Sequence, residues 1–235
     1  MTPDLPAVAI EIVELTNRFR AGEGLPAVAR NSLLDAAAAS YAAYLARTAK
    51  FAHDADGRQP SERVEAAGYG YCKVAENLAM ALDSRGFSTP ALAREAVEGW
   101  INSPGHRRNL LETGVTDIGV AVAKVPDRHP KFVTVQLFGR PQSLMMSFQV
   151  SNSSAATVTY EVAGERHDIE PGHAIRHQTC EASDIVFAPG QGKQGPKPAA
   201  VAARYPAADG RVYVLTSDAK GGLKIAVEER RVLGR

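Results

Sequence analysis

Hydrophobic positions in the first hundred residues recur with the spacing of amphipathic helices. They predict a first helix that ends near Gly22 and has an apolar face of Val8, Ile12, Leu15 and Phe19. An alanine-rich second helix is predicted to open at Ser32, because Asp35 follows three residues later as in a capping box. A short helix after Pro60 and a fourth after Ser88-Thr89-Pro90 follow. The fourth helix presents an apolar face of Leu92, Ala96, Val97, Trp100 and Ile101.

Two strand-like runs close this first half of the chain. Residues 118–125 and 132–138 are rich in β-branched and aromatic side chains, and the "PDRHP" segment between them suits an antiparallel hairpin. Helices combined with a small antiparallel sheet predict a layered α+β domain over residues 1–141.

After residue 142 the pattern becomes one of short β-prone segments separated by turn residues. The segments are "LMMSFQV", "TVTYEV", "DIVFA", "RVYVLTS" and "LKIAVEE", with Asn-Ser, Pro-Gly, Asp-Gly and Gly-Gly between them. "DIEPGHAIRH" is typical of a strand, a Pro-Gly turn and a second strand. Residues 142–235 are therefore predicted to form a small all-β domain of sandwich type, in which "APGQGKQGPKPAA" is a long mobile loop.

Composition excludes several classes of protein. The chain has 235 residues, of which 45% are hydrophobic and 23% charged, and its net charge is +1. This balance is that of an ordinary globular protein without the basic field that nucleic-acid binding needs. No apolar run approaches the roughly 18 residues of a membrane-spanning helix. The N-terminal segment lacks the features of a signal peptide, so the protein is either cytosolic or begins after a removed signal.

The two cysteines, Cys72 and Cys180, are far apart in the sequence and show no metal or redox spacing. They are expected to be either free buried thiols, the favoured alternative, or a bridge between the two domains.

His106 is the first candidate functional group. Ser103 and Pro104 are typical of a helix start, which would place His106 in the first turn of a helix. The positive end of a helix keeps an imidazole neutral, so it can accept a proton or a metal ion. A simple hydrogen bond from His106 to a backbone carbonyl is the alternative. Capping would occupy the Ser103 hydroxyl, which argues against a nucleophilic role for it.

Further candidates lie upstream, in "FAHDADG" with His53 and "VAENLA" with Glu76 and Asn77. Glu95 borders the apolar face of the fourth helix, whereas Arg94 and Glu98 point away from that face. None of the established hydrolase, metal or phosphate-loop spacings is present. Each residue alone carries little weight.

The order of these segments is more specific. Residues 10–141 resemble the CAP superfamily, the cysteine-rich secretory, antigen 5 and pathogenesis-related-1 group, in its bacterial SCP-like form. The matching segments, in the family's order, are "ELTNRFRAGEGLPAV", "LLDAAAASYAAYLA", "FAHDADG", "RVEAAGY", "AENLAMA", "EAVEGWINSPGHRRNLL", "DIGVAVA" and "VTVQLFG". They cover more than half of the chain, and the domain after Pro141 lies outside the family pattern.

The resemblance implies an α/β/α sandwich whose central cleft holds two histidines and two acids. Matched segment by segment, these are His53, Glu76, Glu95 and His106, with Asn77, Trp100 and Ser103 as supporting residues. Two imidazoles and two carboxylates suit Zn²⁺ or another divalent cation, and family members are reported to bind divalent metals here. Two Glu–His pairs, in which each carboxylate orients a ring, are the alternative.

Three functions remain open at this point. The resemblance favours a secreted or periplasmic binding module, with its signal peptide removed, whose cleft holds a metal or a small ligand such as an amphiphile or cell-envelope component. A metal-dependent, peptidase-like hydrolase could use the same residues. The four residues could also be purely structural. The ligand and the oligomeric state do not follow from the sequence.

The β domain contains one further cluster. "EPGHAIRHQTC" places His173, His177 and Cys180 close together, as in some metal sites. Surface turn residues are the favoured interpretation.

Overall fold

The computed structural model describes residues 2–188, 203–219 and 222–229. The chain divides into two compact units, Met1–Leu144 and Met145–Arg235. No helix within the described ranges is long and apolar enough to cross a membrane.

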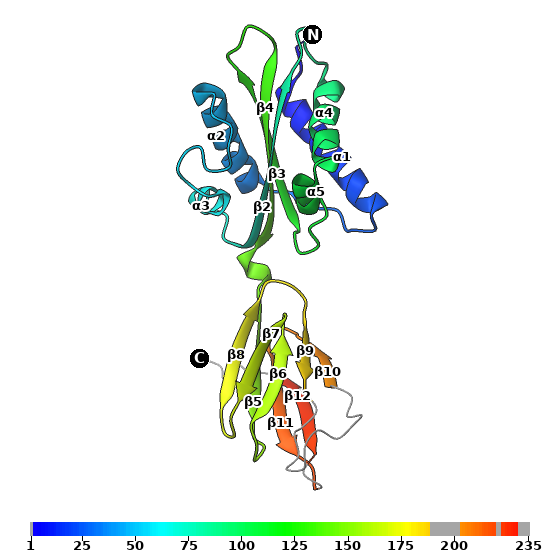
Figure 1. Cartoon of the computed structure of the whole chain (residues 1–235), viewed down its shortest axis with the longest axis vertical. Helices are drawn as coiled ribbons and strands as arrows, with labels where there is room; N and C mark the ends of the chain where they lie inside the picture. The colour runs from blue at the N-terminus through cyan, green and yellow to red at the C-terminus, as the bar shows by residue number, and fades with distance from the viewer. Residues whose placement is uncertain (1, 189–202, 220–221, 230–235) are drawn as a thin grey trace. The chain divides into compact units, whose positions relative to one another are not determined.

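The N-terminal unit contains five α-helices and one four-stranded sheet within the described residues (Figure 1). Its elements are α1 (Leu5–Gly22), β1 (Ala29–Arg30), α2 (Ser32–Thr48), α3 (Pro60–Ala66), β2 (Tyr71–Leu82), α4 (Thr89–Ile101), α5 (Pro104–Leu110), β3 (Asp117–Val125), β4 (Lys131–Pro141) and a 3₁₀ turn, η1 (Gln142–Leu144). The strand order is β1-β3-β4-β2. Only β1, which pairs with β3, is parallel to its neighbour within this sheet.

Helices cover both faces of this sheet, so each face has its own core. Phe132 and Phe138 of β4 pack with the helices α1 and α4, whereas Val133, Val135 and Leu137 pack with α2. Successive strand residues point to opposite faces, and both faces of β4 are buried. The face toward α1 and α4 also carries the buried polar residues Thr134 and Gln136. The three-layer α/β/α fold is confirmed.

Two local predictions for this unit differ from the structure. Asn31, rather than Ser32, caps α2, since its side chain accepts hydrogen bonds from the amides of Leu33 and Leu34. Asp35 instead accepts from the Val120 amide and pairs with Arg30. The long strand β2 was not predicted, because its polar and small residues mask the alternation of a strand.

Within the described residues, the C-terminal unit contains two four-stranded sheets, with strand orders β10-β9-β6-β7 and β12-β11-β5-β8. The strands are β5 (Met146–Asn152), β6 (Val158–Val162), β7 (Glu165–Ile169), β8 (Ala174–Thr179), β9 (Asp184–Phe187), β10 (Ala203–Pro206), β11 (Arg211–Ser217) and β12 (Leu223–Glu229). Side chains of both sheets share one apolar core that includes Phe148, Tyr160, Phe187 and Tyr213. The described part of this unit is all-β, as predicted. Most of the predicted mobile loop, residues 189–200, lies outside the described residues.

The cysteine and histidine expectations for this part of the chain change. Both Cys72 and Cys180 are described, and neither is a free thiol. The favoured expectation of free thiols is therefore wrong. Because Cys180 is disulfide-bonded, it does not supply a free thiolate to a metal. His173 is a surface turn residue as expected, with its ring hydrogen-bonded to the Pro171 carbonyl at 3.1 Å. His177 is instead a half-buried residue of strand β8, so that expectation is wrong for it.

A glycine in β3 allows α2 to approach the sheet closely. A Cβ at Gly119 would lie 2.3 Å from the carbonyl carbon of Leu34 and 2.5 Å from the amide nitrogen of Asp35. Since both atoms belong to the backbone of α2, they cannot move aside as a flexible side chain would. We expect Gly119→Ala to lower the free energy of unfolding of this unit by about 1–3 kcal/mol.

Urea unfolding followed by the fluorescence of Trp100, the single tryptophan, would measure this change. Gly99→Ala in α4 is the matched control, because a Cβ there meets nothing within 4 Å. Alanine should stabilise that helix by about 0.5–1 kcal/mol. Equal effects of the two substitutions would contradict the close-approach interpretation.

Candidate ligand-binding cleft

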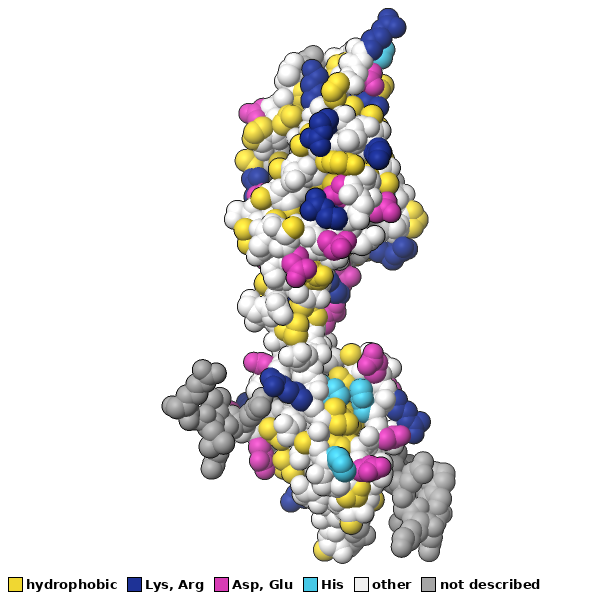
Figure 2. Space-filling view, turned by 90° about the vertical axis from the view of Figure 1, so that its left-hand side faces the viewer, with side chains coloured by type: hydrophobic (Ala, Val, Ile, Leu, Met, Phe, Trp, Pro, Cys, Tyr) yellow, Lys and Arg dark blue, Asp and Glu magenta, His cyan; other side chains and the backbone are white. Residues whose placement is uncertain are grey.

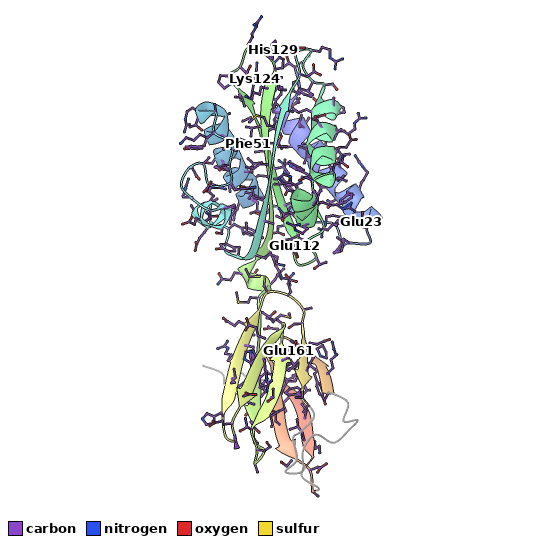
Figure 3. The ribbon with its side chains drawn as sticks, in the orientation of Figure 1. Glu23, Phe51, Glu112, Lys124, His129 and Glu161 are labelled. Atoms are coloured by element: carbon purple, nitrogen blue, oxygen red, sulfur yellow. The ribbon has the colours of Figure 1, made fainter. Side chains whose placement is uncertain are left out.

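The short helix α5, which carries His106, is held in place at both sides. The buried guanidinium of Arg20 donates from Nη1 to the carbonyls of Leu110 at 2.8 Å and Glu112 at 2.9 Å. These carbonyls at the end of α5 would otherwise lack partners. Arg107 forms an ion pair of 2.7 Å with Glu23, which follows α1 (Figure 3). His106 therefore sits on a helix that the core fixes in position.

The start of α5 matches the prediction only in part. Ser103 is the N-cap residue and Pro104 the first helical residue, as predicted. However, the Ser103 side chain makes no capping hydrogen bond. The expectation that capping occupies its hydroxyl is wrong.

Glu76 in β2 is the most buried charged group of the site, with a side chain that is 0% exposed. One carboxylate oxygen, Oε1, lies 2.8 Å from Nδ1 of His53. The other, Oε2, accepts a hydrogen bond of 2.8 Å from Nη2 of Arg63. Both oxygens are thus already partnered, which a buried carboxylate requires.

Arg63 in α3 organises the loop that carries His53. Besides Glu76, its guanidinium donates to the carboxylate of Asp56 at 3.0 Å and to the carbonyls of Arg58 and His53 at 2.6 and 2.9 Å. It also stacks over the Tyr41 ring, with 3.5 Å between its central carbon and the ring centroid. The loop is therefore wrapped around one buried cation.

Asn77, the neighbour of Glu76, connects β2 to α5. Its amide nitrogen donates to the His106 carbonyl at 3.3 Å and to Oε1 of Gln136 at 3.0 Å. In return, the amide nitrogen of Asn109 donates to Oδ1 of Asn77 at 2.9 Å and to the Glu76 carbonyl at 3.0 Å. This network fixes α5 against the strand and so sets where His106 lies.

A cavity of about 270 Å³ lies beside His106. Four of the predicted residues line it, namely Glu95, Trp100, Ser103 and His106, together with Leu78, Ala79, Met80, Ala81, Ala96, Gly99 and Thr134. Trp100 is buried and donates from its indole nitrogen to the Leu78 carbonyl at 2.9 Å. Glu95 is exposed at the edge of its helix. His53, Glu76 and Asn77 do not line this cavity.

The two histidines have opposite electrostatic environments. The hydrogen bond to Glu76 raises the pKa of His53 above its usual value. Burial lowers the pKa of His106, and the charge on His53 lowers it further. The two rings are thus close enough for their charges to interact, and His106 is the ring with the lower pKa.

The predicted four-residue set is divided between two places. His53 and Glu76 form one hydrogen-bonded pair, and Glu95 and His106 share the cavity. Among the described residues, no group of three or more His, Cys, Asp or Glu side chains is arranged to hold a metal ion. A metal site made of all four residues therefore stays a prediction.

The sequence analysis missed Arg63, Asn109 and Gln136. Asn109 lies three residues after His106, and this helical spacing could have placed both on one face of α5. No local signal marks Arg63 or Gln136, because their partners in β2, Glu76 and Asn77, lie 13 and 59 residues away.

Comparison with known proteins finds similar sequences. Residues 13–138 match the family model described as CAP, the cysteine-rich secretory protein family. The uncharacterized protein YkwD of Bacillus subtilis (strain 168) is 32% identical over 111 residues, which are 47% of this chain. The aligned region spans only 40% of that relative's length.

Solved structures of other proteins are also similar to part of this chain. An outer surface protein from Borrelia burgdorferi is 24% identical, with a TM-score of 0.48, and the match covers 56% of this chain and 90% of that one. An extracellular protein with an SCP domain from Bacillus anthracis str. Ames is 28% identical, with a TM-score of 0.48 and coverage of 58% and 41%.

The Glu76–His53 hydrogen bond predicts an order of titration. We expect His53 to titrate at a higher pH than His106 when the ring proton resonances of both are followed by NMR. Glu76→Gln removes the negative charge that stabilises the imidazolium, so it should lower the pKa of His53. Glu98→Gln, on the exposed side of α4, is the control and should leave the His53 curve unchanged. An unchanged curve in Glu76→Gln would refute the assignment.

Removing Arg63 should strongly destabilise the unit. Arg63→Ala leaves the buried Glu76 carboxylate without its main cation, which is expected to cost about 3–5 kcal/mol of unfolding free energy. Arg58→Ala is the matched control, since the Arg58 side chain is half-exposed and Asp56 keeps its ion pair with Arg63, so the loss should be at most about 1 kcal/mol. Chemical denaturation of both variants measures the difference. Equal losses of unfolding free energy in Arg63→Ala and Arg58→Ala would contradict a special contribution of the buried Arg63–Glu76 pair.

Proposed function

Because this chain belongs to the CAP, or cysteine-rich secretory protein, family, we propose that its N-terminal unit is an extracytoplasmic binding module. Its cleft holds a small ligand beside His106, together with a divalent metal ion bound by His53 and His106. The cavity at His106 is the observation that carries the proposal, because it combines an apolar wall with four polar side chains, those of Glu95, Ser103, His106 and Thr134. That combination is typical of small-molecule sites.

The volume of the cavity restricts the ligand. At about 270 Å³ it lies just below the roughly 300–1,000 Å³ of pockets that enclose drug-sized molecules. It therefore fits a polar head group or a short chain better than an entire lipid. Met80, which lines the cavity and is 40% exposed, offers an apolar contact to the remainder of an amphiphile. A small amphiphile or a cell-envelope component of that kind is the proposed ligand class.

The donor chemistry of the two histidines fits a divalent metal. His53 uses Nδ1 for Glu76, which leaves Nε2 available, and a ligating histidine commonly bonds a carboxylate through its other nitrogen. Glu76 suits this orienting role better than direct ligation, since Arg63 already holds its second oxygen. His106 would supply the second imidazole and Glu95 a further carboxylate. A bound Zn²⁺ would polarise an oxygen of the ligand.

Metal-dependent hydrolysis, of the peptidase type, is the second candidate. It is favoured by the depressed pKa of His106, which keeps the ring able to accept a proton, and by the uncapped Ser103 hydroxyl in the same cavity. A peptidase and esterase screen tests it. Activity that depends on His106 would replace binding as the proposed function, whereas activity unaffected by His106→Ala would exclude this cleft as the catalyst.

Equilibrium dialysis against Zn²⁺ followed by metal analysis tests the metal part of the proposal. We expect the double variant His53→Ala/His106→Ala to hold one Zn²⁺ per chain less than the wild type, because two imidazoles are lost. Glu98→Gln is the control and should match the wild type. Unchanged zinc content in the double variant would leave the four residues with a structural role only.

The small-ligand part is tested separately. Protein incubated with candidate amphiphiles, repurified and extracted should yield one bound molecule per chain. Ala96→Leu narrows the cavity with an apolar side chain and should abolish retention, provided that circular dichroism shows a folded protein. An empty extract from the wild type after exposure to every candidate would refute ligand binding.

A further inference from the structure

A second pair of histidines lies in the C-terminal unit, on two of its edge strands. β7 and β8 are each the last strand of their sheets, and the Pro171-Gly172 turn connects them. His167 of β7 is paired across the ladder with Tyr160, and His177 of β8 is paired with Phe148. Histidine side chains lie among hydrophobic ones on the face of this unit shown in Figure 2.

His167 of one sheet and His177 of the other lie close together. The ring centroids of His167 and His177 are 4.8 Å apart. Nε2 of His177 lies 2.7 Å from the Tyr160 hydroxyl, and its ring stacks on Phe148 at 5.2 Å. Both imidazoles are half-buried. This is a compact cluster of polar rings at the rim of an apolar core.

The hydrogen bonds of the cluster leave ring nitrogens available. Tyr160 occupies Nε2 of His177, so the Nδ1 atom of that ring remains for another partner. Among the described residues, neither nitrogen of His167 has a hydrogen-bond partner. These nitrogens are not sealed from solvent, since none is among the buried polar atoms that lack a partner. An ion from solution can therefore reach them.

The spacing of the rings matches that of two imidazoles bound to one ion. With metal–nitrogen bonds of about 2.0–2.1 Å, two histidine rings that share a tetrahedral ion have centroids on the order of 5 Å apart. Imidazole nitrogen is a preferred donor for zinc, copper and nickel ions. We propose that His167 and His177 bind one divalent transition-metal ion, which links the edge strands of the two sheets.

The remaining groups of the cluster suit this role. The hydrogen bond between the Tyr160 hydroxyl and Nε2 fixes the orientation of the His177 ring. In metal-binding histidines, the ring nitrogen that does not bind the metal commonly makes such a hydrogen bond. Glu165, two residues before His167 on β7, is near enough for its negative charge to act on His177. That charge favours a cation at this position. The site is separate from the cleft of the N-terminal unit and does not depend on it.

Isothermal titration of the full chain with Zn²⁺ tests the proposal. The background is the His53→Ala/His106→Ala variant, so that the cleft contributes no signal. We expect saturable binding of one ion per chain, with the affinity lowered at least tenfold by His167→Gln and by His177→Gln. His173→Gln is the matched control, because this exposed turn histidine belongs to the same unit and should leave the binding unchanged.

A second measurement covers the case in which a variant fails to fold. Substoichiometric Ni²⁺ is added to the His53→Ala/His106→Ala protein, which keeps all three histidines of the C-terminal unit. It should broaden the ring resonances of His167 and His177 first, and those of His173 later. Absence of saturable Zn²⁺ binding in the background protein would overturn the proposal. So would binding that folded His167→Gln and His177→Gln both retain, or broadening that begins at His173.

Discussion

The completely buried carboxylate of Glu76 is the group on which the organisation of the N-terminal cleft depends. A charge in that position destabilises the fold by several kcal/mol unless oppositely charged and hydrogen-bonding groups neutralise it. Arg63 and His53 supply those groups. Both come from the segment between α2 and β2, so the position of this loop is tied to the core of the sheet. A residue with a candidate binding role, His53, is thereby placed by the same interaction that stabilises the fold.

The position of β2 at the edge of the sheet explains how the two histidines come together. Glu76 and Asn77 are successive residues and point to opposite faces, so one serves the layer of α2 and α3 and the other the layer of α1, α4 and α5. A central strand would keep these layers apart. At an edge strand, His53 from one layer and His106 from the other can face each other around the sheet. Gln136, which links Asn77 to Thr16 of α1, extends the network into the core.

Histidines occur in pairs in both units, and their surroundings give them different properties. In the N-terminal unit a carboxylate hydrogen bond raises the pKa of His53, whereas burial and the neighbouring charge lower that of His106. In the C-terminal unit the hydrogen-bond partner of His177 is a neutral phenol, that of Tyr160, and burial lowers the pKa of His177. Of these rings, His53, His106 and His177 each have at least one nearby polar group that orients or polarises the ring.

The sequence by itself determined the secondary structure wherever the hydrophobic period was strong, as in α1 and α4, in β3 and β4, and in most strands of the C-terminal unit. The ordered family segments also predicted His53, Glu76, Glu95 and His106 as candidate site residues. Only the tertiary structure decided how these four divide, since the partners of Glu76 and Asn77 lie 13 to 59 residues away. It also revealed β2, and it paired His177 with His167 rather than with His173. Such contacts depend on which faces of the helices and strands pack together, and the local spacing of residues in the sequence does not determine this.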